Sequence, residues 1–181
     1  RQIGVALVIY RDENDNTMSP WLSTLYPDKL DAKDVLICPS DINEEGQVPI
    51  TDWDPHYYDG DQFEDAYDNP DNDGVDMDPK DLDSPVSYFY EFSDAPCDWT
   101  LSGYTASRNP YSWADLKTWQ MKNGDDNNGD EPYDPTLFPM VRCFWHVRTG
   151  TGNDRAPAFN VSYAGNVFKS KVMWERGVWT P

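Results

Sequence analysis

The segment Arg1–Tyr10, RQIGVALVIY, decides the fold of this chain, and the polar run Arg11–Asn16, RDENDN, follows it directly. Apolar residues recur in it at the i, i+3, i+4, i+7 spacing of one helix face, at Ile3, Ala6, Leu7 and Tyr10. Further apolar residues between these positions leave little of the helix surface for water. A helix of this kind must be buried, against a sheet or against copies of itself.

The start of this helix lacks a cap. Arg1 and Gln2 offer no Ser, Thr, Asp or Asn side chain to accept hydrogen bonds from the first amides. The pattern indicates the lower half of a longer helix, and the alternative is a short N-terminal core helix. We therefore expect two parts, a helix with its exit over residues 1–16 and a globular head over residues 17–181.

Composition excludes some classes of partner. The chain has 181 residues, with 33 acidic against 14 basic, so its formal charge is −19. This charge argues against binding to nucleic acid and against docking to an anionic membrane surface. Disorder is the usual reading of such acidity, but 14% aromatic residues with eight Trp indicate a folded core.

The rest of the chain predicts an α+β domain with antiparallel strands. Alternating apolar residues predict strands over Val86–Phe92 and Met140–Val147, the first with one buried face. Ser112 is placed to cap a helix over Tyr111–Lys122. Other expected elements are a short helix or turn at Trp21–Leu25, a strand or buried loop at Asp34–Pro39, and a hairpin of Phe159–Tyr163 and Val167–Trp174 around Ala164–Asn166. Between Ser40 and Pro85 lies a long acidic loop region.

Both ends of the chain resemble a known family. The front segment, RQIGVALVIYRDENDNTMSPWLSTLYPDKLDAKDVLICPSD, is similar to the region after the membrane helix of type IV pilin-like proteins, especially major-pseudopilin relatives of type II secretion. The shared features are Gln2-Ile3-Gly4, the polar loop Asp12–Asn16, the aromatic segment Trp21–Tyr26 and the Cys38-Pro39-Ser40-Asp41 element. FNVSYAGNVF, Phe159–Phe168, resembles the closing hairpin of that family but has Ala164-Gly165-Asn166 where Asp-Gly-His is common.

The resemblance implies a fold and an assembly. It implies a hydrophobic N-terminal helix packed on an antiparallel sheet, anchored in the bacterial inner membrane before assembly and then packed in the core of an extracellular filament. The partners implied are copies of the chain, minor pilins and the inner-membrane assembly platform, and no enzymatic activity is implied. Because the apolar band of the helix exceeds what one sheet covers, we assign the assembly interface to Ile3, Val5, Leu7, Val8 and Ile9.

Two Asp-rich loops are candidate calcium sites. Asn69, Asp71 and Asp73 before Gly74 match the beginning of a calcium loop, and Asp76 and Asp78 continue the alternating oxygen ligands. The flanking helices and the twelfth-position Glu of an EF-hand are absent from the pattern. The alternative is a solvated acidic loop without a metal ion.

The second candidate is DDNNGDEPYD, Asp125–Asp134, in which Asp125, Asn127 and Asp130 surround Gly129. Major pseudopilins bind calcium in a loop late in the chain, so the resemblance favours this position. The ligand pattern itself favours the first loop. Both are therefore kept as hypotheses, with calcium as the expected cofactor.

Three cysteines, Cys38, Cys97 and Cys143, permit one disulfide in any of three pairings. A pilin head folds outside the cytoplasm, where a disulfide persists. We favour Cys97–Cys143, because Cys143 shares a face with Trp145 and can meet a loop after the Tyr88–Phe92 strand. The chain has no CxxC motif, which argues against zinc.

Catalytic motifs of the Ser-hydrolase, zinc-protease and P-loop types do not occur, and His56 and His146 are expected to be structural or exposed. The main alternative function is a soluble extracellular calcium-dependent module that binds carbohydrate through its aromatic residues. A secreted hydrolase is a third hypothesis, for which no carboxylate pair stands out.

Overall fold

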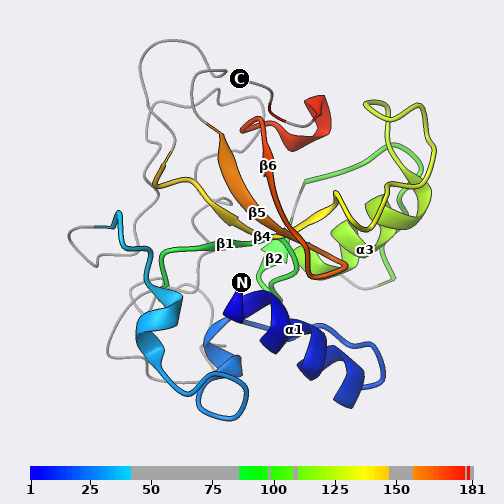
Figure 1. The fold of residues 1–181 in the computed structure, drawn as a ribbon. Helices are drawn as coiled ribbons and strands as arrows, with labels where there is room; N and C mark the ends of the chain where they lie inside the picture. Colours follow the sequence, from blue (N-terminus) through cyan, green and yellow to red (C-terminus); the bar gives the residue numbers. More distant parts are fainter. Residues whose placement is uncertain (42–85, 98, 108–109, 147–156, 178, 180–181) are drawn as a thin grey trace.

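The computed structural model describes residues 1–41, 86–97, 99–107, 110–146, 157–177 and 179 (Figure 1). Its helical elements are α1 (Gln2–Glu13), the 3-10 turns η1 (Ser23–Leu25) and η2 (Lys33–Leu36), α3 (Trp113–Asn123) and the 3-10 turn η3 (Trp174–Arg176). Its strands are β1 (Phe89–Tyr90), β2 (Pro96–Cys97), β3 (Tyr111–Ser112), β4 (Pro139–Cys143), β5 (Ala158–Ser162) and β6 (Val167–Ser170). The expected α+β class is confirmed.

The central sheet has the strand order β1-β4-β5-β6, and all three pairings are antiparallel. Val141 of β4 lies opposite Val161 of β5, and Asn160 of β5 lies opposite Phe168 of β6. The expected hairpin of β5 and β6 is therefore confirmed. Its turn contains Gly165, whose φ of 84° favours glycine.

Helix α1 packs on one face of this sheet. Ile3, Ala6 and Leu7 are buried in a cluster that also contains Val141 and Val161 of the sheet. Gly4 permits the close approach, since a Cβ atom at this position would lie 2.6 Å from Cγ1 of Val161. Within the described part of the chain, no helix has the length and apolar character needed to cross a membrane.

A second apolar cluster covers the opposite face. Phe89 of β1 packs there with Trp113 and Leu116 of α3, whereas its neighbour Tyr90 joins the cluster beneath α1. The expectation of one buried face for Val86–Phe92 is therefore wrong, because layers on both sides of the sheet exclude water from it. Helix α3 lies beside the sheet, on the right in Figure 1.

The sequence-based helix over Tyr111–Lys122 is confirmed as α3. Ser112 Oγ accepts a hydrogen bond from the Asp115 amide at 3.2 Å, and the Ser112 amide donates to Asp115 Oδ2 at 3.0 Å. This reciprocal pair is a capping box, which satisfies two amides that a helix start leaves without partners. The segments Trp21–Leu25 and Asp34–Pro39 contain only the 3-10 turns η1 and η2.

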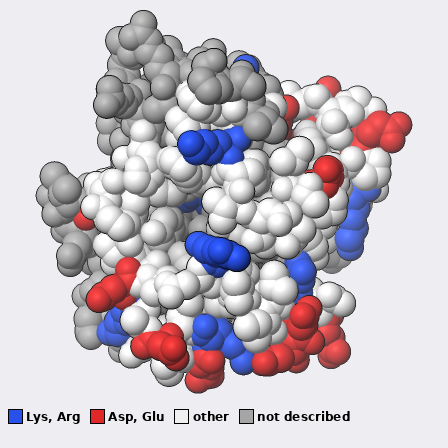
Figure 2. Space-filling view, viewed as in Figure 1, with Lys and Arg blue, Asp and Glu red and all other residues white. Residues whose placement is uncertain are grey.

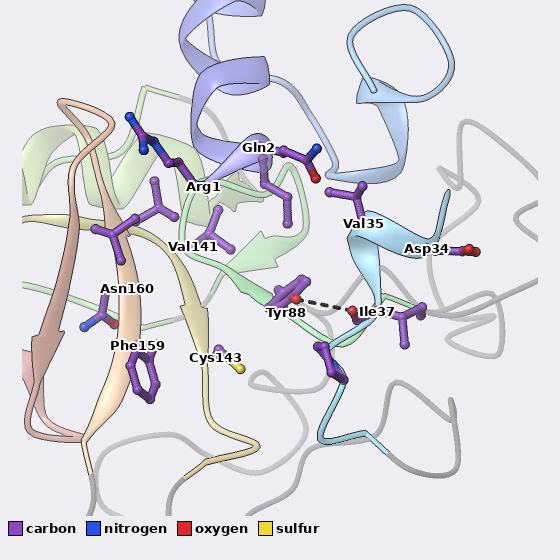
Figure 3. A pocket seen from close by; sticks show the side chains of 14 residues that line it. Arg1, Gln2, Asp34, Val35, Ile37, Tyr88, Val141, Cys143, Phe159 and Asn160 are labelled. Atoms are coloured by element: carbon purple, nitrogen blue, oxygen red, sulfur yellow. Dashed lines mark hydrogen bonds between the residues drawn. The ribbon is translucent and has the colours of Figure 1, made fainter. Parts of the chain in front are cut away.

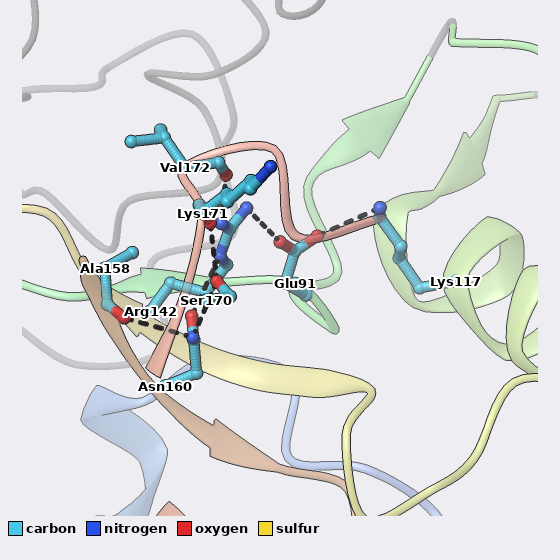
Figure 4. Close-up of polar contacts among 8 residues, drawn as sticks. All are labelled: Glu91, Lys117, Arg142, Ala158, Asn160, Ser170, Lys171 and Val172. Carbon is cyan, nitrogen blue, oxygen red and sulfur yellow. Dashed lines mark hydrogen bonds and ion pairs between the residues drawn. The ribbon is translucent and has the colours of Figure 1, made fainter. Parts of the chain in front are cut away.

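Three fully buried charges connect α3 to the sheet (Figure 4). Glu91 Oε2 lies 3.1 Å from Lys117 Nζ of α3, and Glu91 Oε1 lies 3.2 Å from Arg142 Nη1 of β4. Arg142 also donates through Nε to Asn160 Oδ1 at 3.2 Å and through Nη2 to the Val172 carbonyl. The guanidinium thereby connects β4, β5 and the segment after β6.

Candidate functional site

The exposed face of α1 is the first candidate. Val5 and Ile9 are 53% and 42% exposed, and they lie one helical turn apart. Ile3 and Leu7 are only 6% and 1% exposed, so the assignment of these two to an assembly interface is corrected: their side chains point into the subunit's own core. The i, i+4 geometry that buries one pair leaves the other pair facing outward.

Charge is unevenly distributed over this face of the molecule. Figure 2 shows most of the acidic side chains along the lower edge, together with basic ones, whereas the charged side chains at the centre of the face are basic. At its C-terminal end, α1 is held to the sheet side by Arg11, which donates to the Tyr163 carbonyl at 2.9 Å and lies over the Tyr163 ring at 4.4 Å. The apolar part of the helix surface is therefore fixed in place.

A pocket of about 450 Å³ lies beside the first turn of α1 (Figure 3). Its wall includes Ile3 of α1, Ile37 after η2, and Val141 and Cys143 of β4. The Tyr88 hydroxyl donates to the Ile37 carbonyl at 3.3 Å, and burial raises the pKa of this phenol. The pocket is mainly apolar, and Arg1, Gln2 and Asp34 are among its polar lining residues.

The second acidic loop contains one buried carboxylate. Asp125 is 4% exposed, and it accepts hydrogen bonds from Gln120 Nε2 (2.6 Å), the Asn127 amide (2.8 Å) and the Tyr133 hydroxyl (2.7 Å). Burial and the hydrogen bond to Asp125 raise the pKa of Tyr133. Asn127 and Asp130 are exposed. In this structure, Asp125 organises the loop through protein donors.

Calcium binding stays a prediction for both loops. Asn69, Asp71, Asp73, Asp76 and Asp78 of the first loop lie outside the described residues, as does His56. Among the residues that the structure describes, one group of at least three His, Cys, Asp or Glu side chains converges closely enough to hold a metal ion, and it does not include Asp125 or Asp130.

The cysteines are arranged differently from the expected pairing. Cys143 Sγ lies 3.5 Å from Cys38 Sγ, whereas Cys97 packs in the cluster around Trp113 on the opposite face of the sheet. All three are buried free thiols. The proposed Cys97–Cys143 pairing is corrected for this reason, because Cys143 shares the α1 side of β4 with Val141.

Cys38 and Cys143 also meet His146, and these three form the converging group. His146 Nε2 lies 3.5 Å from Cys38 Sγ, and Nδ1 lies 3.3 Å from Ser40 Oγ. Local sequence patterns do not reveal this group, because Cys38 is 105 residues from Cys143. The Cys-x-x-His spacing of Cys143 and His146 was the available signal.

Comparison with known proteins adds no relative: no protein-family model, curated protein or solved structure matches the chain significantly. The similarity to pilin-like proteins therefore rests on the sequence motifs at the two ends of the chain.

Proposed function

We propose that this chain is a structural subunit of an extracellular pilus-like or pseudopilus-like filament and polymerises through α1. The observation that carries the proposal is the pair Val5 and Ile9, which are 53% and 42% exposed on a helix whose opposite face is buried. Large apolar side chains exposed together are typical of a contact surface. The resemblance of residues 1–41 and 159–168 to pilin-like proteins supports the same function.

The energetics of this contact are modest for one subunit and accumulate along a filament. Burying an entire Val or Ile side chain stabilises by roughly 1.5–3 kcal/mol, and about half of each side chain is still open here. A neighbour that covers both residues therefore gains roughly 1.5–3 kcal/mol. In a polymer every subunit makes this contact with each equivalent neighbour.

The proposal specifies partners and location. The partners are copies of the chain, with minor pilins and an inner-membrane assembly platform as further components, and the location is the periplasm or the cell surface. The formal charge of −19 is compatible with this, since no anionic polymer has to be bound. The proposed role is structural and requires no catalysis.

Charge substitution on the exposed face tests the proposal. Val5→Asp and Ile9→Asp should abolish filaments formed by the full-length protein, as seen by electron microscopy, because a carboxylate would be desolvated at the contact. Both variants should remain folded, because the substituted side chains face water in the subunit. The matched control is Leu137→Asp, at a residue that is also 42% exposed but lies outside α1. Filaments that persist in Val5→Asp and Ile9→Asp, or that disappear equally in Leu137→Asp, would overturn the assignment.

A further inference from the structure

We propose that Cys38, Cys143 and His146 form a binding site for a thiophilic divalent metal ion, with zinc as the best fit, and that a water molecule or another ligand completes the coordination. Two sulfur atoms and one imidazole nitrogen are ligands that zinc accepts, and three protein ligands leave a fourth tetrahedral position open. The site is separate from the exposed face of α1. It is also separate from both acidic loops.

The distances fit a tetrahedral ion. With Zn–S near 2.3 Å and Zn–N near 2.0–2.1 Å, tetrahedral geometry places two sulfur ligands about 3.8 Å apart and a sulfur and a nitrogen about 3.5 Å apart. The structure has 3.5 Å between the sulfur atoms of Cys38 and Cys143, and 3.5 Å between Cys38 Sγ and His146 Nε2. All three ligand atoms lie within 4.8 Å of one another.

The imidazole is held in a suitable orientation. Ser40 Oγ lies 3.3 Å from His146 Nδ1, which leaves Nε2 directed at the thiols. The ring also packs edge-on against Phe159, with 5.0 Å between the ring centroids. A hydrogen bond to the far nitrogen is the usual support of a metal-binding histidine, because it fixes both the tautomer and the ring orientation. Ser40 follows Cys38 by two residues, so one short segment supplies both a ligand and its support.

A buried negative charge lies near the proposed site, because the carboxylate of Asp41 is close enough to Cys143 to act on it electrostatically. Asp41 is 3% exposed and accepts a hydrogen bond from Ser87 Oγ at 2.7 Å. A divalent ion replaces the thiol protons and compensates this negative charge, so its affinity should increase with pH.

The site is accessible from two directions. His146 is exposed, and Cys143 also lines the pocket beside α1 (Figure 3). A disulfide between Cys38 and Cys143 is the competing use of the same two sulfur atoms. Such a bond would give His146 no role, whereas the metal site uses all three side chains.

Cobalt substitution tests the proposal directly. The complete chain is reduced, freed of reductant and titrated with Co²⁺. We expect one equivalent to bind, with a sulfur-to-cobalt charge-transfer band and the intense visible bands of a tetrahedral site, both of which Zn²⁺ should displace. Carboxylates of the acidic loops cannot produce a thiolate band, so the spectrum separates the two kinds of site.

Variants decide which residues bind the ion. Cys143→Ser and His146→Gln should lose the tetrahedral cobalt spectrum, and Ser40→Ala should weaken binding by about tenfold. His146 is exposed, so its variant should stay folded even if Cys143→Ser does not. Cys97→Ser is the matched control, a buried cysteine outside the site, and it should keep the spectrum.

Three results would overturn the proposal. The first is the absence of a thiolate–cobalt band in the reduced wild type. The second is an unchanged spectrum in His146→Gln. The third is a Cys38–Cys143 disulfide, found by non-reducing peptide mass spectrometry in protein isolated without metal chelators, since oxidised sulfur atoms cannot bind the ion.

Discussion

Replacement of Glu91 by Gln should strongly destabilise the fold. The side chain of Glu91 is fully buried and lies within 3.1–3.2 Å of two buried cations, Lys117 and Arg142. Gln preserves the size and removes the negative charge. The substitution therefore leaves two positive charges without their shared anion in a region from which water is excluded (Figure 4).

The expected loss follows from that burial. Removing one partner of a buried ion pair costs about 3–5 kcal/mol, because the remaining charge stays desolvated. For a domain of this length, each kcal/mol corresponds to roughly 2–4 °C in melting temperature. Glu91→Gln should therefore lower the melting temperature by about 6–20 °C.

Thermal and urea denaturation measure this effect. Glu131→Gln, which neutralises an exposed acid, is the control and should change the free energy of unfolding by at most about 0.5 kcal/mol. Adding Lys117→Met to Glu91→Gln should recover part of the loss, because it removes one of the stranded cations. The reasoning would be refuted if Glu91→Gln lowered the free energy of unfolding by less than about 1 kcal/mol. It would also be refuted if the double variant were destabilised by the sum of the two single changes.

Three further predictions address α3, pH and calcium. Ser112→Ala should lower the free energy of unfolding by about 1 kcal/mol in urea denaturation, because it removes the capping box, whereas Thr118→Ala within the same helix should not. Burial raises the pKa of the Glu175 carboxyl above its usual 4.5, so the folded state binds this proton more tightly than the unfolded state, and the free energy of unfolding should fall as pH rises past 4.5. Glu175→Gln should flatten this dependence of stability on pH. Parallel pH profiles for the variant and the wild type would contradict the prediction. Calcium at a hundredfold excess over its dissociation constant should raise the melting temperature by about 5–10 °C, and magnesium should raise it much less. Asp125→Ala with Asp130→Ala should remove the part of this increase that comes from the second loop. Identical melting curves in calcium and in chelator would exclude calcium binding.

Local patterns in the sequence predicted the elements that depend on neighbouring residues. The helix repeat of Arg1–Tyr10, the Ser112 cap and the hairpin around Gly165 each involve groups within about one turn or one hairpin. The apolar spacing placed Ile3 and Leu7 on one helix face, but we assigned both to the assembly interface, whereas the structure buries them in the core. The spacing did not separate them from Val5 and Ile9, since all four lie in one nearly continuous apolar run.

The difference between these helix positions came from packing. Gly4 lets α1 approach Val161 closely, and this contact determines the helix rotation that buries Leu7 and exposes Val5. The burial of Glu91 likewise depends on α3, which covers the second face of the sheet and supplies Lys117. An acidic residue in an alternating strand gives no sign of this environment, because its partners are far away in the sequence.

The sequence by itself determined the α+β class, the capped helix and the closing hairpin, because the groups involved are close together along the chain. Only the tertiary structure decided which cysteines meet. Cys38 and Cys143 are 105 residues apart, and they come together with His146 because β4 and the segment after η2 share the α1 side of the sheet. Cys97 packs on the other face. Contacts between distant segments depend on which face of the sheet each side chain occupies, and local periodicity does not contain that information.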